Sequence, residues 1–193
     1  MNFSNTPTLK NQYVQLNTLS SDHGDDLATA VGELWKAWYT NIPAPEDMAA
    51  EITRRLALQQ QQLMAPWVII DPATGKAVGM TTYMNLDPGH RRLEIGSTWL
   101  SARHQGKQIN PAMKLLLLER AFDKLDCIAV EFRTHWHNRQ SRAAIEKLGA
   151  KQDGVLRNHQ ITAEGVIRDT VIYSILNTEW PAVRAGLQYR LAS

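Results

Sequence analysis

Residues 100–110, which read LSARHQGKQIN, combine residue types that hold an anion. Arg103 can bind phosphate oxygens as a planar fork, and Lys107 can bind them as a point charge. Gly106 lets the backbone approach a ligand closely because no side chain stands in the way. The apolar stretch that follows has a helical pattern, and a helix N-terminus presents free N–H groups to a diphosphate. The segment therefore predicts a diphosphate site, with a simple surface turn at the glycine as the alternative.

Other cofactor classes find no support in the sequence. It contains no dinucleotide fingerprint of three spaced glycines and no phosphate loop ending in Gly-Lys-Ser/Thr, so we expect neither a nicotinamide cofactor nor a nucleoside triphosphate. His135 and His137 would project from one face of a strand, but no cysteine or evident acidic residue completes a zinc site. We therefore expect no metal. Cys127, the one cysteine, lies in an apolar stretch and is expected to be a buried structural thiol.

Two motifs, in the right order, resemble those of the GNAT acetyltransferases. The acetyl-CoA loop of that family reads Arg/Gln-x-x-Gly-x-Gly/Ala before a helix; Arg103 and Gly106 match it, and Gln108 departs from it. Downstream, Asn138 and Ser141 match the family's Asn-x-x-Ser/Ala stretch. The chain also resembles the RimJ/RimL-like branch, the ribosomal-protein N-terminal acetyltransferases, and the similar stretches are residues 154–157, 165–169 and 179–181.

The resemblance, which spans residues 13–191, implies that a neutral primary amine attacks the thioester of acetyl-CoA directly. Acetyl-CoA is then a co-substrate, and no metal takes part. The resemblance also implies that a strand edge at residues 98–100 pairs with the pantetheine amides and that a backbone N–H there stabilises the oxyanion. The expected cofactor contacts are Thr98, Trp99, Leu100, Arg103, Gln105, Gly106, Lys107, Gln108, Ile109, Asn110, Asn138 and Ser141.

Two proton transfers complete this chemistry. Glu94 is the candidate general base, acting directly or through water, because it points to the strand face opposite Leu93 and Ile95; an exposed strand carboxylate is the alternative. Many family members place the acid, a tyrosine, seven residues after the asparagine, but Ile145 stands there in this chain. Ser141 is the candidate acid in its place, with a helix N-cap as the alternative.

The acceptor is expected beside the first helical region, because that region borders the acceptor pocket in the family. Trp35 and Trp38 are the candidate acceptor-binding residues, together with Glu94, although the spacing of the tryptophans also suits the core face of a helix. We expect the acceptor to be a protein N-terminus or a small-molecule amine. The alternative function is a catalytically silent CoA-binding sensor or scaffold, because Gln108 and Ile145 depart from the family pattern.

The elements that position these residues follow from hydrophobic periodicity. Period-two stretches predict strands at residues 13–16, 67–70, 78–83, 92–100, 128–132 and 166–176. Helical spacing and cap residues predict helices at residues 25–38, 46–63, 113–122, 141–148 and 180–191. Strands that alternate with helices imply a mixed sheet covered by helices. The resemblance implies an α/β (mixed α+β) GNAT-like fold, with a mostly antiparallel sheet of about six or seven strands, about four flanking helices and a C-terminal helix.

Composition limits the class of protein. The 193 residues are 44% hydrophobic and 21% charged, and we expect a single acetyltransferase domain over residues 1–193. A net charge of +2 argues against a nucleic-acid partner. No apolar run approaches the roughly 20 residues that span a bilayer, and no signal peptide is evident, so a cytoplasmic location without a membrane partner is expected. The sequence leaves the oligomeric state open, a homodimer included.

Overall fold

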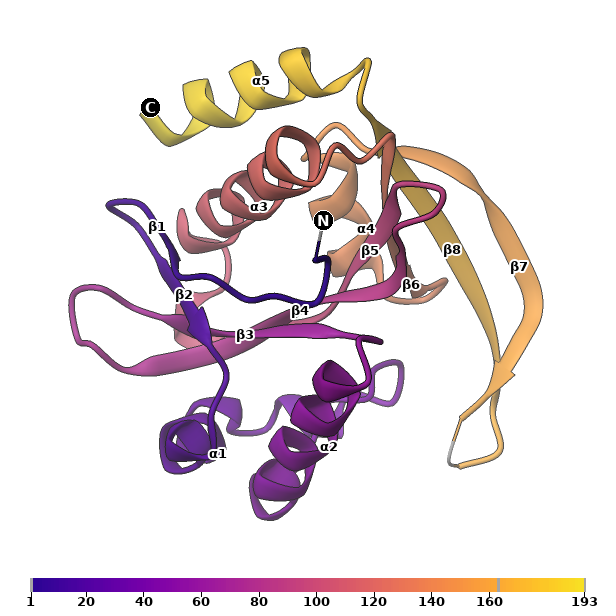
Figure 1. Ribbon diagram of the computed structural model, residues 1–193. Coiled ribbons are helices and arrows are strands. Elements are labelled where there is room, and N and C mark those ends of the chain that lie inside the picture. The colour runs from indigo at the N-terminus through magenta and orange to yellow at the C-terminus, as the bar shows by residue number, and fades with distance from the viewer. Residues whose placement is uncertain (1, 163, 193) are drawn as a thin grey trace.

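The computed structural model describes residues 2–162 and 164–192, and one eight-stranded sheet runs through it (Figure 1). Its strands lie in the order β1-β2-β3-β4-β5-β6-β8-β7. Neighbouring strands are antiparallel except β5 and β6, which run parallel. The strands are Leu9–Lys10 (β1), Gln15–Thr18 (β2), Ala65–Ile70 (β3), Ala77–Asp87 (β4), Arg92–Leu100 (β5), Ala129–His135 (β6), Lys151–Ile161 (β7) and Ile167–Leu176 (β8).

Helices cover both faces of the sheet (Figure 1). Over the described ranges the α-helices are Gly24–Val31 (α1), Met48–Gln60 (α2), Ile109–Glu119 (α3), Arg139–Glu146 (α4) and Trp180–Ala192 (α5). In Figure 1, α1 and α2 lie below the sheet and α3 and α5 lie above it. The far end of the β7–β8 hairpin reaches down toward the level of α2, so it approaches the side of the sheet that α1 and α2 cover. The mixed α/β fold expected from the family resemblance is confirmed.

Each face of the sheet has its own core. The larger core, on the α3 and α5 side, includes Leu93 and Ile95 of β5 and Phe132 of β6. The smaller core, under α1 and α2, includes Ile52 and Met80. Side chains alternate along a strand, and Leu93 and Ile95 face the larger core. Glu94, which lies between them, therefore faces the side of the sheet that α1 and α2 cover. The prediction that Glu94 points to the strand face opposite Leu93 and Ile95 is confirmed.

Helix α3 is buried almost all round, as its apolar composition predicts, but it begins earlier than expected. Ile109 is its first residue and Gln108 occupies the N-cap without a side-chain hydrogen bond. Asn110 and Pro111 therefore lie inside the first turn, whereas the sequence predicted that the helix begins at residue 113. Proline is compatible with this position because the first turn needs no N–H from it.

The first helix is shorter than its hydrophobic spacing suggests. Helix α1 ends at Val31, because Gly32 follows with φ of 50° and breaks the helical path. Trp35 then lies in a short 3-10 helix, Leu34–Lys36, and Trp38 lies in the irregular segment after it, with 39% and 53% of their surfaces exposed. The expectation that they form part of the first helix and its core stripe is wrong. Their spacing matches one face of an α-helix, but α1 ends before it reaches them.

The number of strands exceeds the expected six or seven. The sheet has eight strands because two were not recognised: the two-residue β1 and the long outer strand β7. Strand β7 is mostly exposed or half-buried on both faces, since it lies at the sheet edge beyond β8. It therefore lacks the alternation of apolar and polar residues by which a strand is recognised. The described ranges contain five α-helices, and the last of them, α5, is the expected C-terminal helix, so the helix count agrees with the expected one.

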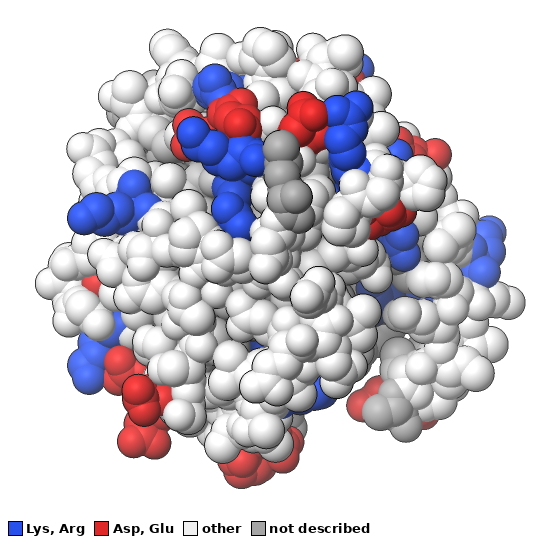
Figure 2. Space-filling model, in the orientation of Figure 1, with Lys and Arg blue, Asp and Glu red and all other residues white. Residues whose placement is uncertain are grey.

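The charged surface matches the near-neutral composition. On the face in Figure 2, Lys and Arg side chains are interspersed with Asp and Glu, without an extended area of one sign among the described residues. No described helix combines the length and the hydropathy that crossing a membrane requires.

Candidate active site

The parallel strands β5 and β6 separate into a wedge partway along their length. They pair only from Arg92 to Glu94, opposite Ala129 to Glu131. Residues 95–100 of β5 and 132–135 of β6 continue without pairing to each other; we call this gap the β5–β6 wedge. Backbone N–H and C=O groups along such an edge can pair with an extended ligand.

A β-bulge bends β5 at the mouth of the wedge. Met80 opposes Trp99 and Thr82 opposes Gly96, so β5 carries the extra residue of the bulge, and Ser97 has φ of 45°. The buried Arg55 of α2 donates to Thr82 Oγ1 at 2.7 Å and to the Ser97 carbonyl at 3.4 Å. Helix α2 thereby holds the strand edge that contains residues 98–100.

The predicted diphosphate loop joins the wedge to α3. Gly106 has φ of 72° and open space around it, so this position requires the left-handed backbone conformation that glycine adopts readily. Arg103 and Lys107 are exposed and form no hydrogen bond or ion pair with another described residue. Since no side chain caps α3, its first N–H groups and these two cations remain available to an anion.

The loop is braced by its own polar residues. His104, which is buried, bonds Ser101 Oγ at 2.6 Å. Gln105 donates to the Leu100 carbonyl at 2.9 Å and accepts from Gln140 Nε2 of α4 at 3.0 Å. Gln105 thus ties the loop to both sides of the wedge, and in the free protein its side chain is already engaged.

Helix α4 brings the second predicted motif to the same region. Asn138 is its N-cap, and its Oδ1 accepts from the Ser141 backbone N–H at 3.0 Å. Asn138 therefore caps α4, while its amide nitrogen has no hydrogen-bond partner among the described residues. Ser141 is not the N-cap, and its half-buried hydroxyl forms no hydrogen bond with the described chain. Ile145, at the position of the family tyrosine, is buried in the larger core.

Glu94 is buried, with 5% of its surface exposed, so the alternative of an exposed strand carboxylate is wrong. Asn85 Nδ2 donates to its Oε2 at 2.7 Å, and Arg133 Nε lies 3.4 Å from the same oxygen. Burial raises the pKa of Glu94, against the lowering effects of Arg133 and Asn85. Gly96 leaves room for the carboxylate, because a Cβ there would lie 2.7 Å from Glu94 Oε1 and 2.8 Å from Met84 Sδ.

Lys114 of α3 is a buried amine beside the wedge that the sequence reasoning missed. Its Nζ donates to Thr98 Oγ1 at 3.1 Å and lies 5.8 Å from the centre of the Phe132 ring. These partners belong to β5 and β6, the two strands that separate. Burial lowers the pKa of Lys114 to about 7, so its charge is lost near neutral pH. The available signal was a lone cation in a helix that is otherwise apolar all round.

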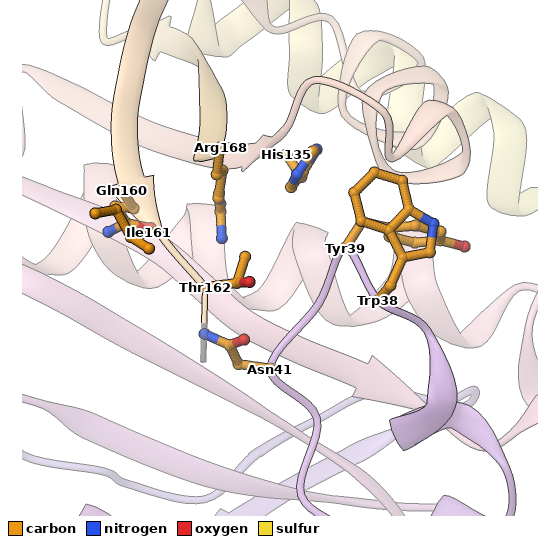
Figure 3. Close-up of a pocket in the computed structure, with 8 residues that line it drawn as sticks. All are labelled: Trp38, Tyr39, Asn41, His135, Gln160, Ile161, Thr162 and Arg168. Carbon is orange, nitrogen blue, oxygen red and sulfur yellow. The ribbon is translucent and has the colours of Figure 1, made fainter. Parts of the chain in front are cut away.

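A pocket lies where the segment after α1 meets β6 and the tip of the β7–β8 hairpin. We call it the Trp38 pocket; its cavity volume is about 30 Å³, and it is partly open to solvent. Trp38 packs edge-on against His135, with ring centres 5.1 Å apart, and also contacts His137 at 5.6 Å. Trp35 does not line this pocket. The lining residues are Trp38, Tyr39, Asn41, His135, Gln160, Ile161, Thr162 and Arg168 (Figure 3).

The remaining predicted residues lie on β5, at the start of α3 and at the start of α4. Thr98, Trp99 and Leu100 form the β5 side of the wedge, and Gln108, Ile109 and Asn110 form the start of α3. Asn138 and Ser141 lie at the start of α4. Sequence reasoning predicted the strand at 166–176 but missed Arg168 as a site residue, because its neighbours in the pocket, His135 and Trp38, are distant in the chain. No cluster of three or more His, Cys, Asp or Glu side chains suited to a metal occurs in residues 2–162 and 164–192.

Comparisons with known proteins agree on one family. Residues 14–151 match the family described as the acetyltransferase (GNAT) domain. YdaF of Bacillus subtilis (strain 168), proposed to be a ribosomal N-acetyltransferase, is 34% identical over 106 residues, which are 55% of this chain and 57% of YdaF. The chain therefore matches little more than half the length of that relative.

Solved structures share the fold over nearly the whole chain. The crystal structure of a proposed acetyltransferase from T. thermophilus is 30% identical, with a TM-score of 0.87 over 98% of this chain and 99% of that one. RimJ of Mycobacterium smegmatis, solved in complex with CoA-disulfide, is 19% identical, with a TM-score of 0.79 over 98% of this chain and 96% of that one.

Proposed function

This chain belongs to the GNAT acetyltransferase family, and on that premise we propose that it transfers the acetyl group of acetyl-CoA to a primary amine by direct attack. The observation that carries the proposal is the β5–β6 wedge, which leads into the N-terminus of α3, where no side chain caps the helix and two cations are exposed. We propose that residues 1–193 act as one acetyltransferase domain, since a single sheet carries every residue group of the site.

The wedge and the loop suit the two halves of CoA. The pantetheine arm would extend along β5 at Thr98, Trp99 and Leu100, where its amides can pair with the free strand edge. The diphosphate would lie at residues 103–110, against Gly106, the exposed cations and the N-terminus of α3. The Asn138 amide nitrogen is available to the pantetheine arm. RimJ was solved with CoA-disulfide, and a related ligand in this chain is part of the proposal.

Glu94 is the proposed general base. A carboxylate whose pKa is raised by burial is a stronger proton acceptor at neutral pH than an exposed one. Asn85 and Arg133 hold its Oε2, while Gly96 keeps the space beside its Oε1 free of a side chain. The base would take a proton from the acceptor ammonium, directly or through water, so that the neutral amine can attack the thioester carbonyl.

The tetrahedral intermediate needs an oxyanion donor and then an acid for the departing sulfur. A backbone N–H of residues 98–100 is the proposed oxyanion donor, because that edge faces the wedge. When the carbon–sulfur bond breaks, the CoA thiolate takes a proton. The Ser141 hydroxyl is the proposed source, since it has no partner in the described chain. Lys114 is the second candidate, because its amine contacts the same strand edge.

The acceptor is proposed to be a protein N-terminus or a small-molecule amine bound at the Trp38 pocket. Trp38 lines that pocket and Glu94 lies on the same face of the sheet, which supports an acceptor that spans the two. Trp35, the other tryptophan predicted from the sequence to bind the acceptor, would contact only acceptors that extend beyond the pocket. The name of YdaF favours a protein N-terminus.

The decisive experiment measures release of free thiol from acetyl-CoA across a panel of amines and peptides, together with CoA affinity. Gly106→Glu should abolish CoA binding, because the added carboxylate repels the diphosphate and occupies its space. Gly75→Glu is the matched control: Gly75 has φ of 69° and open space around it, but lies in the β3–β4 turn. Unchanged CoA affinity in Gly106→Glu would refute the loop assignment, and binding without turnover on any acceptor would favour the silent CoA-binding module.

A further inference from the structure

The Trp38 pocket contains two hydrogen-bond donors that the described chain leaves without acceptors. We propose that the acceptor amine carries an anionic oxygen group, a carboxylate or a phosphate, and that Arg168 and His135 bind this group while Glu94 serves the amine. This inference rests on the proposed acetyl transfer and names its substrate class. Figure 3 shows Arg168 projecting from β8 into the group, with His135 and Trp38 to one side of it.

Arg168 has no internal partner for its charge. It forms no hydrogen bond or ion pair with any other residue in the described ranges, and its Nε is buried without an acceptor. Burial lowers the pKa of Arg168. The negative charge of Glu94 acts in the opposite direction, although Glu94 forms no ion pair with Arg168. A half-buried guanidinium without a partner is costly, and a carboxylate or phosphate satisfies it as a bidentate acceptor.

His135 presents a second donor to the same space. The His137 backbone N–H donates to His135 Nδ1 at 3.0 Å, which leaves the proton of the neutral ring on Nε2. Nε2 is buried and has no acceptor in the described chain. Burial and the charge of Arg168 lower the pKa of His135, so the ring stays neutral and Nε2 remains a donor at neutral pH.

The nearby carboxylates are already engaged. Asp169, whose charge also acts on His135, accepts from Arg157 Nε at 2.6 Å and from the Asn158 backbone N–H at 2.7 Å. Glu94 is held by Asn85 and Arg133. The hydrogen-bond donors of Arg168 and His135 therefore have no carboxylate available to them among these neighbours. An anionic ligand would supply the missing acceptor.

The register of the strands determines how far the anionic group lies from the amine. Glu94 opposes Glu131, and His135 lies four residues further along β6, about 13 Å at the strand rise. Side chains from both ends shorten this gap, and Arg133 occupies the face between them. An acidic side chain at the second or third residue of a peptide reaches this far from the N-terminal amine, whereas the α-carboxylate of a free amino acid does not.

The test compares matched acceptors that differ only in charge. Peptide amides with Asp, Asn, phosphoserine or Ser at the second position, and with Glu or Gln at the third, would be assayed by thiol release from acetyl-CoA. 6-Aminohexanoate and its amide, in which the amine and the terminal group are separated by five carbon atoms, would represent small-molecule acceptors. We expect kcat/KM for the anionic member of a peptide pair to exceed that of the neutral member by about tenfold or more, as a charge-assisted contact gives.

Two variants localise the effect. Arg168→Gln should reduce the ratio of anionic to neutral acceptor toward one, whereas Arg190→Gln, the same charge change on the exposed surface of α5, should keep it. A preference for the acidic small molecule alone would support anionic recognition and assign it to small acceptors. Equal rates within every pair, or a ratio that survives Arg168→Gln, would overturn the inference and leave acetyl transfer intact. Failure to acetylate any acceptor would instead refute the proposed function.

Discussion

Lys114→Met should stabilise the protein, and the gain should depend on pH. Lys114 is 6% exposed, and burial lowers its pKa from 10.5 to about 7 without any carboxylate partner. While Lys114 is charged, a shift of that size lowers the free energy of unfolding by about 5 kcal/mol. Methionine has a similar length and no charge to desolvate, so it removes this cost.

The direction of the pH dependence follows from the two pKa values. Between pH 7 and 10.5 the unfolded chain keeps the proton on Lys114 while the folded chain has released it. The unfolded state therefore binds more protons, and wild-type stability rises with pH across this window. The cost is complete below pH 7 and vanishes above 10.5. The advantage of the variant should thus be about 4 kcal/mol at pH 7 and about 2 kcal/mol at pH 9.

The assay is equilibrium unfolding in urea, followed by tryptophan fluorescence and circular dichroism at pH 6, 7, 8 and 9. Lys124→Met serves as the control, because Lys124 is exposed and should change stability by no more than about 0.5 kcal/mol at any pH. A variant that is less stable than wild type, or a gain that is the same at pH 6 and pH 9, would refute the reasoning. Either result would mean that the Lys114 ammonium is solvated in the folded chain.

The remaining predictions concern the proton transfers. Glu94→Gln should lower kcat/KM by about 10²–10⁴-fold, the usual contribution of a general base. Because burial raises the pKa of Glu94, the acidic limb of the wild-type pH–rate profile should lie above 4.5 and disappear in the variant; a retained limb would assign it to another group. Ser141→Ala should lower kcat with little change in CoA affinity, measured by calorimetry. If kcat is unchanged, the acid role passes to Lys114.

Local sequence signals predicted the elements that carry the proposed cofactor site. The strand at 92–100 alternates and the helix after the glycine loop is almost entirely apolar, because both are packed against the larger core. Asn138 and Ser141 were found by motif, and the structure assigns Asn138 as the cap of α4. The acceptor side was predicted less well. Helix α1 was extended past Gly32, and β7 was not recognised, since neither an irregular segment nor an edge strand follows a simple period.

The sequence by itself determined the family, the position of the glycine loop proposed to bind the diphosphate, and the face of the strand that carries Glu94. These properties depend on residue types at short spacing, on strand alternation and on helix-start chemistry, which act within about ten residues. Only the tertiary structure decided that β5 and β6 separate beyond Glu94, that Lys114 is buried between them, and that Arg168 meets His135 and Trp38. Those contacts join elements distant in the chain, and their energies depend on burial and on the absence of partners, which spacing does not encode.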